Sequence, residues 1–588
     1  MSCDKLVYDL ANEVGGSPSV FMAKDWIQIM DNQNQNYASN QITLDTSQLS
    51  NSAKYMSYRE AYLEVPVLLT VGADGVGASQ ASETPATSCD RAVSLKNWFG
   101  NLIHSMVIEY NGTTIVQQTP FQNLHSHWKL ESTFSWDDVH NQGHIIGLYP
   151  DDPTTFSYHT ANTPEGIGHC NNRNLDSEPA VAGAHFSFNK GASGAGNYNL
   201  GLKKRQDMYI YDPAGALGST DATGTADDFV ASSLQSETNT KNIYRSYVSA
   251  KVNGDVAVRG YIQFSIMATI YLKHLHSFFQ SVPLLKGAYM KMTFNINNST
   301  TKFACAGNAS GAITLQSVSV PVGGVNPLMI SSALGNNGAR NICTAGAGDN
   351  FIADVSVGAT CLSSELSGVN QGQLAKSVHL HLPSYVFNPT FEGSYLSNPV
   401  KEIVYEDIYQ YQVLNIGADQ VFNNLITNGI ANLKHILIVP YHSTTGAENL
   451  LPAGTPSYRS PFNGCGAGST DPYISINNFQ VIVSGKNEIH NTQKYSFEAW
   501  NNQIFGQKSV NGNQVDGIQS GLINRLGFDT TKSFQYVDIS RMLPNDRTVP
   551  KSVQISGTNQ SAKAIDLYVF LCYGTSFKLD VFTGTRTM

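Results

Sequence analysis

Charged side chains are scarce in this chain of 588 residues. Asp, Glu, Lys and Arg make up 14% of it, against about 25% in an average globular protein. The balance of 36 Lys and Arg against 45 Asp and Glu gives a net charge of −9. A protein that coats nucleic acid needs a basic face, so the sequence predicts no sequence-specific nucleic-acid partner. Low charge fits a surface that contacts copies of the same chain, and uncharged polar loops explain the figure equally well.

Paired cysteines and long apolar runs are also lacking. The eight cysteines are spread widely without a CxxC pair, which is the spacing of neither a disulfide framework nor a zinc site. No window approaches 18 uninterrupted apolar residues, and the N-terminal stretch does not resemble a secretion signal. We therefore expect an intracellular, reducing site of synthesis and no membrane span.

Enzyme motifs are absent as well. The chain contains no GxxxxGK[ST], no HExxH, no EF-hand loop and no GxSxG. The compact basic run Lys203–Lys204–Arg205 is interpreted as a solvated loop. The sequence predicts no enzyme, no catalytic or cofactor-binding residues, and no metal site.

Three groups of residues carry side chains that could support such chemistry. His125, His127, His140 and His144, near Asp137 and Asp138, offer metal-ligand chemistry, but aromatic and turn-like residues separate them, which favours polar loop histidines. The adjacent carboxylates Asp151–Asp152 and Glu406–Asp407 point apart on a strand and make poor acid–base pairs. Cys170 after His169 is interpreted as a loop cysteine, because adjacency in sequence does not establish a nucleophile and its base.

Residues 261–297 show the most informative pattern. Tyr261–Tyr271 is apolar, aromatic and β-branched without Gly or Pro, which predicts a strand. Leu272, Leu275, His276 and Phe279 then follow helical spacing up to Pro283. Gly287 permits a tight turn, and strict alternation from Ala288 predicts a second strand. This stretch predicts strand, short helix and strand in succession.

Many other short strands are predicted, with few helices. Asn111–Gly112 between Ile103–Tyr110 and Thr114–Gln117 is a strong hairpin signal. Two separate strands, Ala564–Tyr573 and Phe577–Phe582, are expected near the C-terminus. Short strands separated by turn clusters indicate a sandwich or barrel rather than alternating βα units.

The predicted organisation has four parts. Residues 1–19 form an N-terminal arm, and 20–297 form a first unit with a long loop insertion at about 153–255. Residues 298–373 form a connector rich in Gly, Ala and Ser, and 374–588 form the second unit.

Several stretches in both halves resemble the double jelly-roll major capsid proteins of the virophage and polinton-like virus group. They are NYASNQITLDTS (36–47), YREAYLEVP (58–66), LKHLHSFFQSVPLLKGAYMKM (272–292), TFEGSYLSNPVKEIVYE (390–406) and the C-terminal run 536–584. The resemblance implies an all-β fold of two side-by-side eight-stranded jelly rolls, with long loop insertions and a few short helices.

The same resemblance implies a structural role. It predicts pseudo-hexagonal homotrimers that tile an icosahedral shell around double-stranded DNA, in a virion assembled inside the host cell. The expected partners are the chain itself and penton and minor or cement capsid proteins. Two alternatives were kept: a carbohydrate-binding β-sandwich protein, and a receptor-binding minor capsid or spike protein. The family supplies no catalytic residues.

Overall fold

The computed structural model describes about three fifths of the chain. The described residues are 19–31, 37, 40–49, 52–73, 93–151, 157–158, 170–171, 201, 205, 244–248, 252–253, 256–257, 261–305, 313–330, 351–358, 377–443, 456–461, 470, 474–490, 495–504, 521–530, 532–540, 547–561, 563–581 and 586–587. All structural statements below concern these residues.

Eight strands of the second half form two packed sheets. Numbered one to eight in chain order, they run 1-8-3-6 in one sheet and 2-7-4-5 in the other. This alternation between two layers is the strand order of a jelly roll. The strands are β20 (Val400–Ile416), β21 (Val421–Ile430), β22 (Leu433–His442), β23 (Ile476–Val483), β24 (Lys486–His490), β25 (Gln535–Asp538), β26 (Lys551–Asn559) and β27 (Ile565–Asp580), and β28 (Arg586–Thr587) pairs with β27.

The strands of the first half reproduce part of this jelly-roll strand order. One sheet is β2-β14-β6-β7, and in the other β4 pairs with β13, which reproduces 1-8-3 and 2-7 of the second roll. The second sheet is then extended: β10 joins β13, while β18 and β19 share the other edge of β4. The strands are β1 (Phe21–Met30), β2 (Gln41–Asp45), β3 (Tyr55–Met56), β4 (Tyr62–Ala73), β6 (Ile103–Tyr110), β7 (Thr113–Val116), β10 (Tyr244–Val248), β13 (Tyr261–Tyr271), β14 (Met290–Ile296), β15 (Ser299–Cys305), β16 (Ile313–Ser319), β18 (Phe351–Gly358) and β19 (His379–Phe387).

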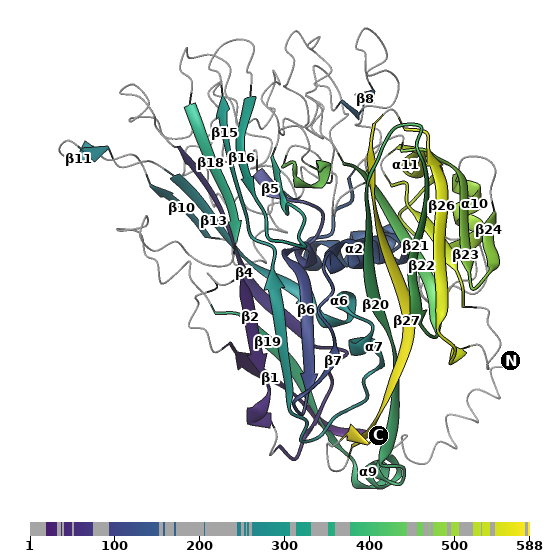
Figure 1. Cartoon of the computed structure of the whole chain (residues 1–588). Helices are drawn as coiled ribbons and strands as arrows, with labels where there is room; N and C mark the ends of the chain where they lie inside the picture. The colour runs from purple at the N-terminus through teal and green to yellow at the C-terminus, as the bar shows by residue number, and fades with distance from the viewer. Residues whose placement is uncertain are drawn as a thin grey trace, which may run out of the picture.

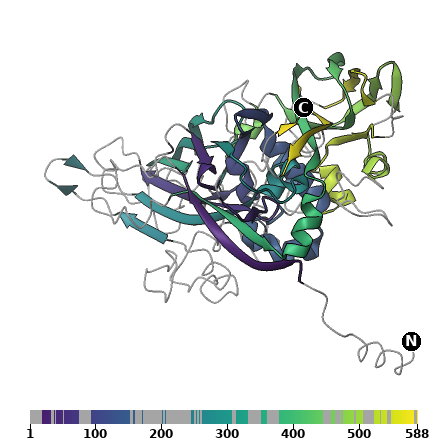
Figure 2. The same ribbon diagram turned by 90° about the horizontal axis from the view of Figure 1, so that it is seen from below.

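The two rolls stand side by side with short helices between and around them. The green and yellow strands of the second roll gather on one side of the molecule in both views (Figure 1, Figure 2). The fold is therefore the predicted double jelly roll. The helices are α2 (Gln122–Thr133), α3 (Trp136–Ile146), α6 (Leu272–Leu275), α7 (Phe278–Ser281), α9 (Pro389–Leu396), α10 (Phe497–Ile504) and α11 (Arg525–Thr530). Within the described ranges, no helix combines the length and apolar character needed to cross a bilayer.

Remaining short elements complete the description. β5 (Val93–Leu95) pairs with β17 (Leu328–Ile330), β8 (Ser157–Tyr158) with β9 (Cys170–Asn171), and β11 (Val252–Asn253) with β12 (Val256–Ala257). Three 3₁₀ turns are η1 (Ser47–Leu49), η3 (Phe99–Leu102) and η6 (Ser457–Arg459).

The prediction for residues 261–297 is confirmed. β13 spans Tyr261–Tyr271, α6 and α7 follow, Gly287 has a φ of +66°, and β14 begins at Met290. In β14 Met290, Met292 and Phe294 are buried, while the two residues between them are half-buried. Alternation of side chains along a strand explains why this segment was readable from sequence.

The hairpin at Asn111–Gly112 is also confirmed, and it supports a stability prediction. Asn111 and Gly112 have φ values of +46° and +76°, the backbone of a type I′ turn between β6 and β7. Because an L side chain strains this conformation, Gly112→Ala is expected to cost about 1 kcal/mol of unfolding free energy. Urea unfolding should detect this loss. Gly393→Ala, in helix α9 with open space around it, is the control and should not destabilise the chain.

The C-terminal strands differ from the prediction. The expected pair, Ala564–Tyr573 and Phe577–Phe582, is one continuous strand, β27, of 16 residues. Gly574, Thr575 and Ser576 pair in register with Glu406, Tyr405 and Val404 of β20. Asn432 also donates a hydrogen bond of 2.8 Å to the carbonyl of Gly574. The turn-like residues are held in the sheet because both neighbours satisfy their backbone groups.

Strands on both sides of the predicted boundary near residue 373 belong to the same sheet of the first roll. β15, β16 and β18 lie within residues 298–373 and join the first roll's extended sheet, and β19 pairs with β1 and β4 of that sheet. The division near residue 373 remains a prediction. Most of the predicted arm (1–19) and insertion (153–255) lies outside the described residues.

Candidate functional site: a buried polar junction between the rolls

Helix α2 lies at the junction of the two rolls (Figure 1). Phe121, Leu124 and Trp128 pack into the core of the second roll, whereas Leu130 packs into the core of the first. Residues three to four apart share a helix face, so one helix presents different faces to the two cores. Its position couples the first half of the chain to the second.

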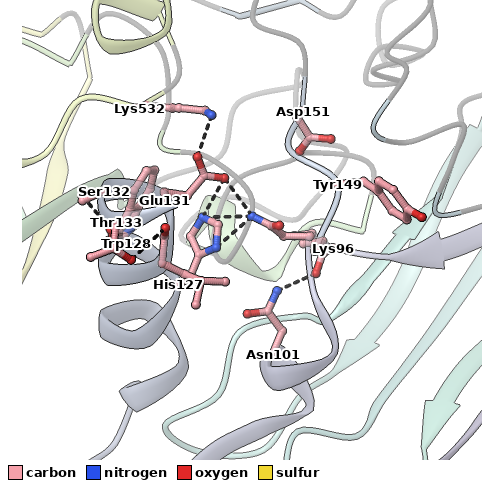
Figure 3. Close-up of polar contacts among 12 residues, drawn as sticks. Lys96, Asn101, His127, Trp128, Glu131, Ser132, Thr133, Tyr149, Asp151 and Lys532 are labelled. Carbon is pink, nitrogen blue, oxygen red and sulfur yellow. Dashed lines mark hydrogen bonds and ion pairs between the residues drawn. The ribbon is translucent and has the colours of Figure 1, made fainter. Parts of the chain in front are cut away.

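A buried ion pair crosses this junction. Glu131 Oε2 of α2 accepts a hydrogen bond of 2.8 Å from Lys532 Nζ of the second roll. Its other oxygen, Oε1, lies 3.2 Å from Asn97 Nδ2, and the same amide lies 2.8 Å from His127 Nδ1. Figure 3 shows Lys532, Glu131 and His127 converging between α2 and the segment around Lys96.

Further hydrogen bonds extend the junction. Lys96 Nζ donates to the carbonyl of Ser460 at 2.8 Å, and Asn101 Nδ2 donates to the carbonyl of Lys96 at 2.5 Å. The backbone N–H of Leu522 donates to the carbonyl of Glu131 at 2.8 Å. Gly521 has a φ of +66°, and a Cβ there would lie 2.4 Å from the Glu131 carbonyl oxygen. The chain needs glycine at this close approach.

Burial fixes the charge states in the junction. Glu131 and Lys532 are 0% and 2% exposed, so each charge depends on the other for compensation. Burial, reinforced by the Lys532 cation, holds the pKa of His127 well below its ordinary value. His127 is therefore neutral at pH 7 and acts as a hydrogen-bonding group.

The predicted basic run has a different role from the one expected. Arg205 is 1% exposed, and its guanidinium contacts Asp151 Oδ1 at 2.5 Å and the carbonyls of Leu95 and Tyr149. The interpretation as a solvated loop residue is wrong for Arg205, because a buried carboxylate and two carbonyls replace its hydration. Lys203 and Lys204 lie outside the described residues.

The four histidines considered as possible metal ligands do not come together in the structure. His125 and His127 are buried in α2, whereas His140 is exposed on α3. The interpretation of His125 and His127 as polar loop histidines is wrong, because α2 is packed between two cores. Two residues apart on a helix, they point in different directions. Asp138 belongs to the capping box of α3, where its side chain accepts from the backbone N–H of Ser135 at 2.9 Å.

The adjacent carboxylates point apart as expected. Asp407 is buried and accepts a hydrogen bond of 3.3 Å from the Tyr573 hydroxyl, whereas Glu406 is half-buried and lines a small cavity. Asp151 pairs with Arg205, and Asp152 lies outside the described residues. Cys170 starts β9, but its side chain is not described.

The junction is chemically suited to holding two domains together. Its ionic and polar side chains are at most 3% exposed, which leaves a substrate no route to them. Asn97 and Lys532 were missed at the sequence level, because Lys532 lies 401 positions from its partner Glu131. No local motif signals a pair of that kind.

Comparisons with known proteins gave matches to solved structures alone. Neither protein-family models nor curated protein sequences gave a match. The Sputnik virophage structure solved by cryo-EM matches with 10% identity and a TM-score of 0.47, covering 98% of this chain and 91% of the other. The mavirus major capsid protein matches with 11% identity and a TM-score of 0.43, covering 98% and 92%.

A third solved structure also matches nearly the whole chain. The Faustovirus major capsid protein matches with 10% identity and a TM-score of 0.39, covering 96% of this chain and 92% of the other. Two of these three structures are named as major capsid proteins, the class that the sequence resemblance indicates. The fold assignment itself rests on the strand order described above.

Proposed function

We propose that this chain is a major capsid protein that forms pseudo-hexagonal homotrimers and tiles an icosahedral shell around double-stranded DNA. The observation that supports this most is the presence of two jelly rolls, side by side, in one chain. Two similar rolls per chain give a threefold trimer six similar sectors, and such a ring packs in a hexagonal lattice. The sequence resemblance and the low charge point the same way.

The first roll offers one self-association surface on strand β1. Every fourth residue of β1, namely Met22, Trp26 and Met30, is 63%, 52% and 57% exposed, although β1 pairs with β19 along most of its length. β1 also ends the strand order of its sheet among the described strands. An exposed, largely apolar edge strand is a site for association with another chain.

The second roll offers a different surface on its edge strands β20 and β21. The exposed apolar residues there are Val400, Val404, Tyr409, Leu414, Val421 and Leu425. Contact between unlike surfaces of identical chains is head-to-tail, and it closes into a ring when the rotation allows. Burial of the β1 surface against the β20–β21 surface of a neighbour would build the trimer. Obligate interfaces of this kind bury about 2,000–5,000 Å² or more.

The remaining features of the proposal follow from this role. The chain acts in the virion shell, is synthesised and assembled inside the host cell, and contacts penton and minor or cement proteins as well as itself. It has no catalytic function. The sealed junction between the rolls supports this, because its ionic groups hold the two halves together.

Light scattering and electron microscopy of the purified full chain test the proposal. We expect a mass of three chains of 63.8 kDa each at micromolar concentration, and hexagonal sheets or shells in micrographs. A monomer would contradict the proposal, and a monomer that binds a glycan array specifically would support the carbohydrate-binding alternative. A trimer that never forms sheets or shells would instead indicate a spike or minor capsid protein.

Surface substitutions test the assignment of the interface. Trp26→Glu and Leu425→Glu are each expected to weaken trimer formation about 30-fold or more, as loss of an interface residue worth about 2 kcal/mol does. Val322→Glu, at a position 95% exposed and outside both surfaces, is the control and should leave the trimer intact. Trimers of unchanged stability in both interface variants would show that these surfaces lie outside the interface.

A further inference from the structure

Three potential metal ligands meet next to α2, outside the ion-pair network. His125 Nε2 of α2 lies 3.2 Å from Cys572 Sγ of β27. His435 of β22 is the cross-strand partner of Cys572. One ligand atom from each of the three lies within 4.8 Å of the others. The group unites one residue of the first half with two of the second roll.

These side chains are buried, and their hydrogen bonding is incomplete. His125, His435 and Cys572 are 7%, 4% and 1% exposed. His435 Nδ1 has no hydrogen-bond partner, and neither has His276 Nε2, which is also buried and lies 3.5 Å from Asp407 Oδ1. An unpaired buried imidazole nitrogen costs about 1–3 kcal/mol. A bound ligand would remove part of that cost.

The donor set and the spacing fit zinc. One thiolate and two imidazoles are ordinary zinc ligands, and bonds of about 2.3 Å to sulfur and 2.0–2.1 Å to nitrogen place tetrahedral ligands roughly 3.3–3.6 Å apart. The observed separations, 3.2 Å for one pair and at most 4.8 Å for the others, reach that geometry by small side-chain shifts.

Space for the fourth ligand is also present. A cavity of about 20 Å³ is bordered by His125, Cys572, His276 and Glu406, which is room for one water molecule. A water molecule in this cavity can complete the tetrahedron. The carboxylate of Glu406 balances the positive charge that a zinc ion with one thiolate leaves.

We propose that His125, His435 and Cys572 bind a zinc ion that fastens α2 to the second roll. The ion would stabilise the fold, because its ligands come from α2, β22 and β27 and it would hold together elements that are far apart in sequence. This proposal differs from the sequence-based prediction of no metal site. The expectation followed from cysteine spacing, which cannot register a site assembled from residues 447 positions apart. The proposal does not depend on capsid assembly.

Metal analysis of the untagged full chain, purified without chelators, tests the site. We expect about one zinc ion per chain, the stoichiometry of one site. Cys572→Ser and His435→Ala should each reduce the zinc content to background and lower the Tm. The double variant His379→Ala, His381→Ala is the matched control. It removes the half-buried Glu64–His379–His381 group and should keep the zinc.

Cobalt substitution keeps the test decisive even if the variants misfold. The wild-type chain refolded with Co²⁺ should show intense tetrahedral absorption together with a sulfur-to-cobalt charge-transfer band. The proposal is overturned by a chain that holds no zinc and takes up no Co²⁺. It is equally overturned by cobalt absorption without the sulfur band, or by zinc that survives Cys572→Ser and is lost in the His379/His381 control.

Discussion

Replacing Glu131 with glutamine is expected to destabilise the chain by about 3–5 kcal/mol, the usual cost of removing one partner of a buried ion pair. Glutamine keeps the shape of the side chain but leaves the Lys532 ammonium, 2% exposed, without a compensating charge. The free energy of unfolding in urea, measured at fixed protein concentration, should fall by this amount.

A second substitution separates lost pairing from lost packing. Combining Glu131→Gln with Lys532→Met removes both charges, and a buried pair replaced by neutral groups is often close to neutral in stability. The double variant should therefore be more stable than Glu131→Gln alone, with a coupling of at least about 1 kcal/mol. If the two changes simply add, the ion pair does not stabilise the junction.

Glu109 provides the matched control. Its carboxylate lies 3.6 Å from Lys291 Nζ, but both side chains are more than a third exposed. Glu109→Gln should change the free energy of unfolding by less than about 1 kcal/mol, because water screens exposed pairs. A loss as large as that of Glu131→Gln would mean that burial is not what distinguishes the two sites.

Acid is expected to unfold the chain through its buried neutral histidines, with His104 as a measurable case. Burial lowers the pKa of His104 on β6 from 6.5 to about 4. Between these values the unfolded chain binds a proton that the folded chain does not, so stability falls as the pH drops. The effect is absent above pH 6.5 and reaches about 3 kcal/mol near pH 4.

His274 acts in the same direction. Burial, followed by the neighbouring Lys273 cation, lowers its pKa to about 3. Its ring lies edge-on to Trp98, Phe134 and Tyr271, with centroid distances of 5.5–6.4 Å. Acid stability therefore depends on more than one histidine.

Urea unfolding at pH 7 and at pH 4.5 measures this effect. His104→Gln, which stays neutral throughout, should lose less stability on acidification than the wild type, by about 2–3 kcal/mol. His140→Gln, at an exposed position of α3, is the control and should keep the wild-type dependence. A wild-type slope in His104→Gln would show that His104 does not contribute.

Strands and turns could be predicted where neighbouring residues alone determine the backbone conformation. Tyr261–Tyr271 became β13 with the predicted bounds, and the Asn111–Gly112 turn formed because both positions accept positive φ. Gly574 shows where such signals fail. It resembles a turn, but pairing with Glu406 and contact with Asn432 keep it within β27. Neighbouring strands overrode the local preference.

The site residues were beyond local reasoning. The sequence groups His125 with His127, His140 and His144. In the structure these three histidines lie elsewhere or point away from His125. Its real neighbours, His435 and Cys572, come from the second roll. A basic run such as Lys203–Lys204–Arg205 predicts a solvated loop when its surroundings are unknown, and the burial of Arg205 against Asp151 has no local sequence signal.

The amino-acid sequence by itself determined strands such as Tyr261–Tyr271, the turn at Asn111–Gly112 and the all-β class, because side-chain alternation and turn chemistry act over a few residues. Tertiary structure alone decided which charges are paired, which histidines are neutral and where Cys572 meets two imidazoles. Those properties depend on burial and on contacts such as Glu131 with Lys532, 401 positions apart. A local sequence pattern does not show which distant residues come into contact in the folded chain.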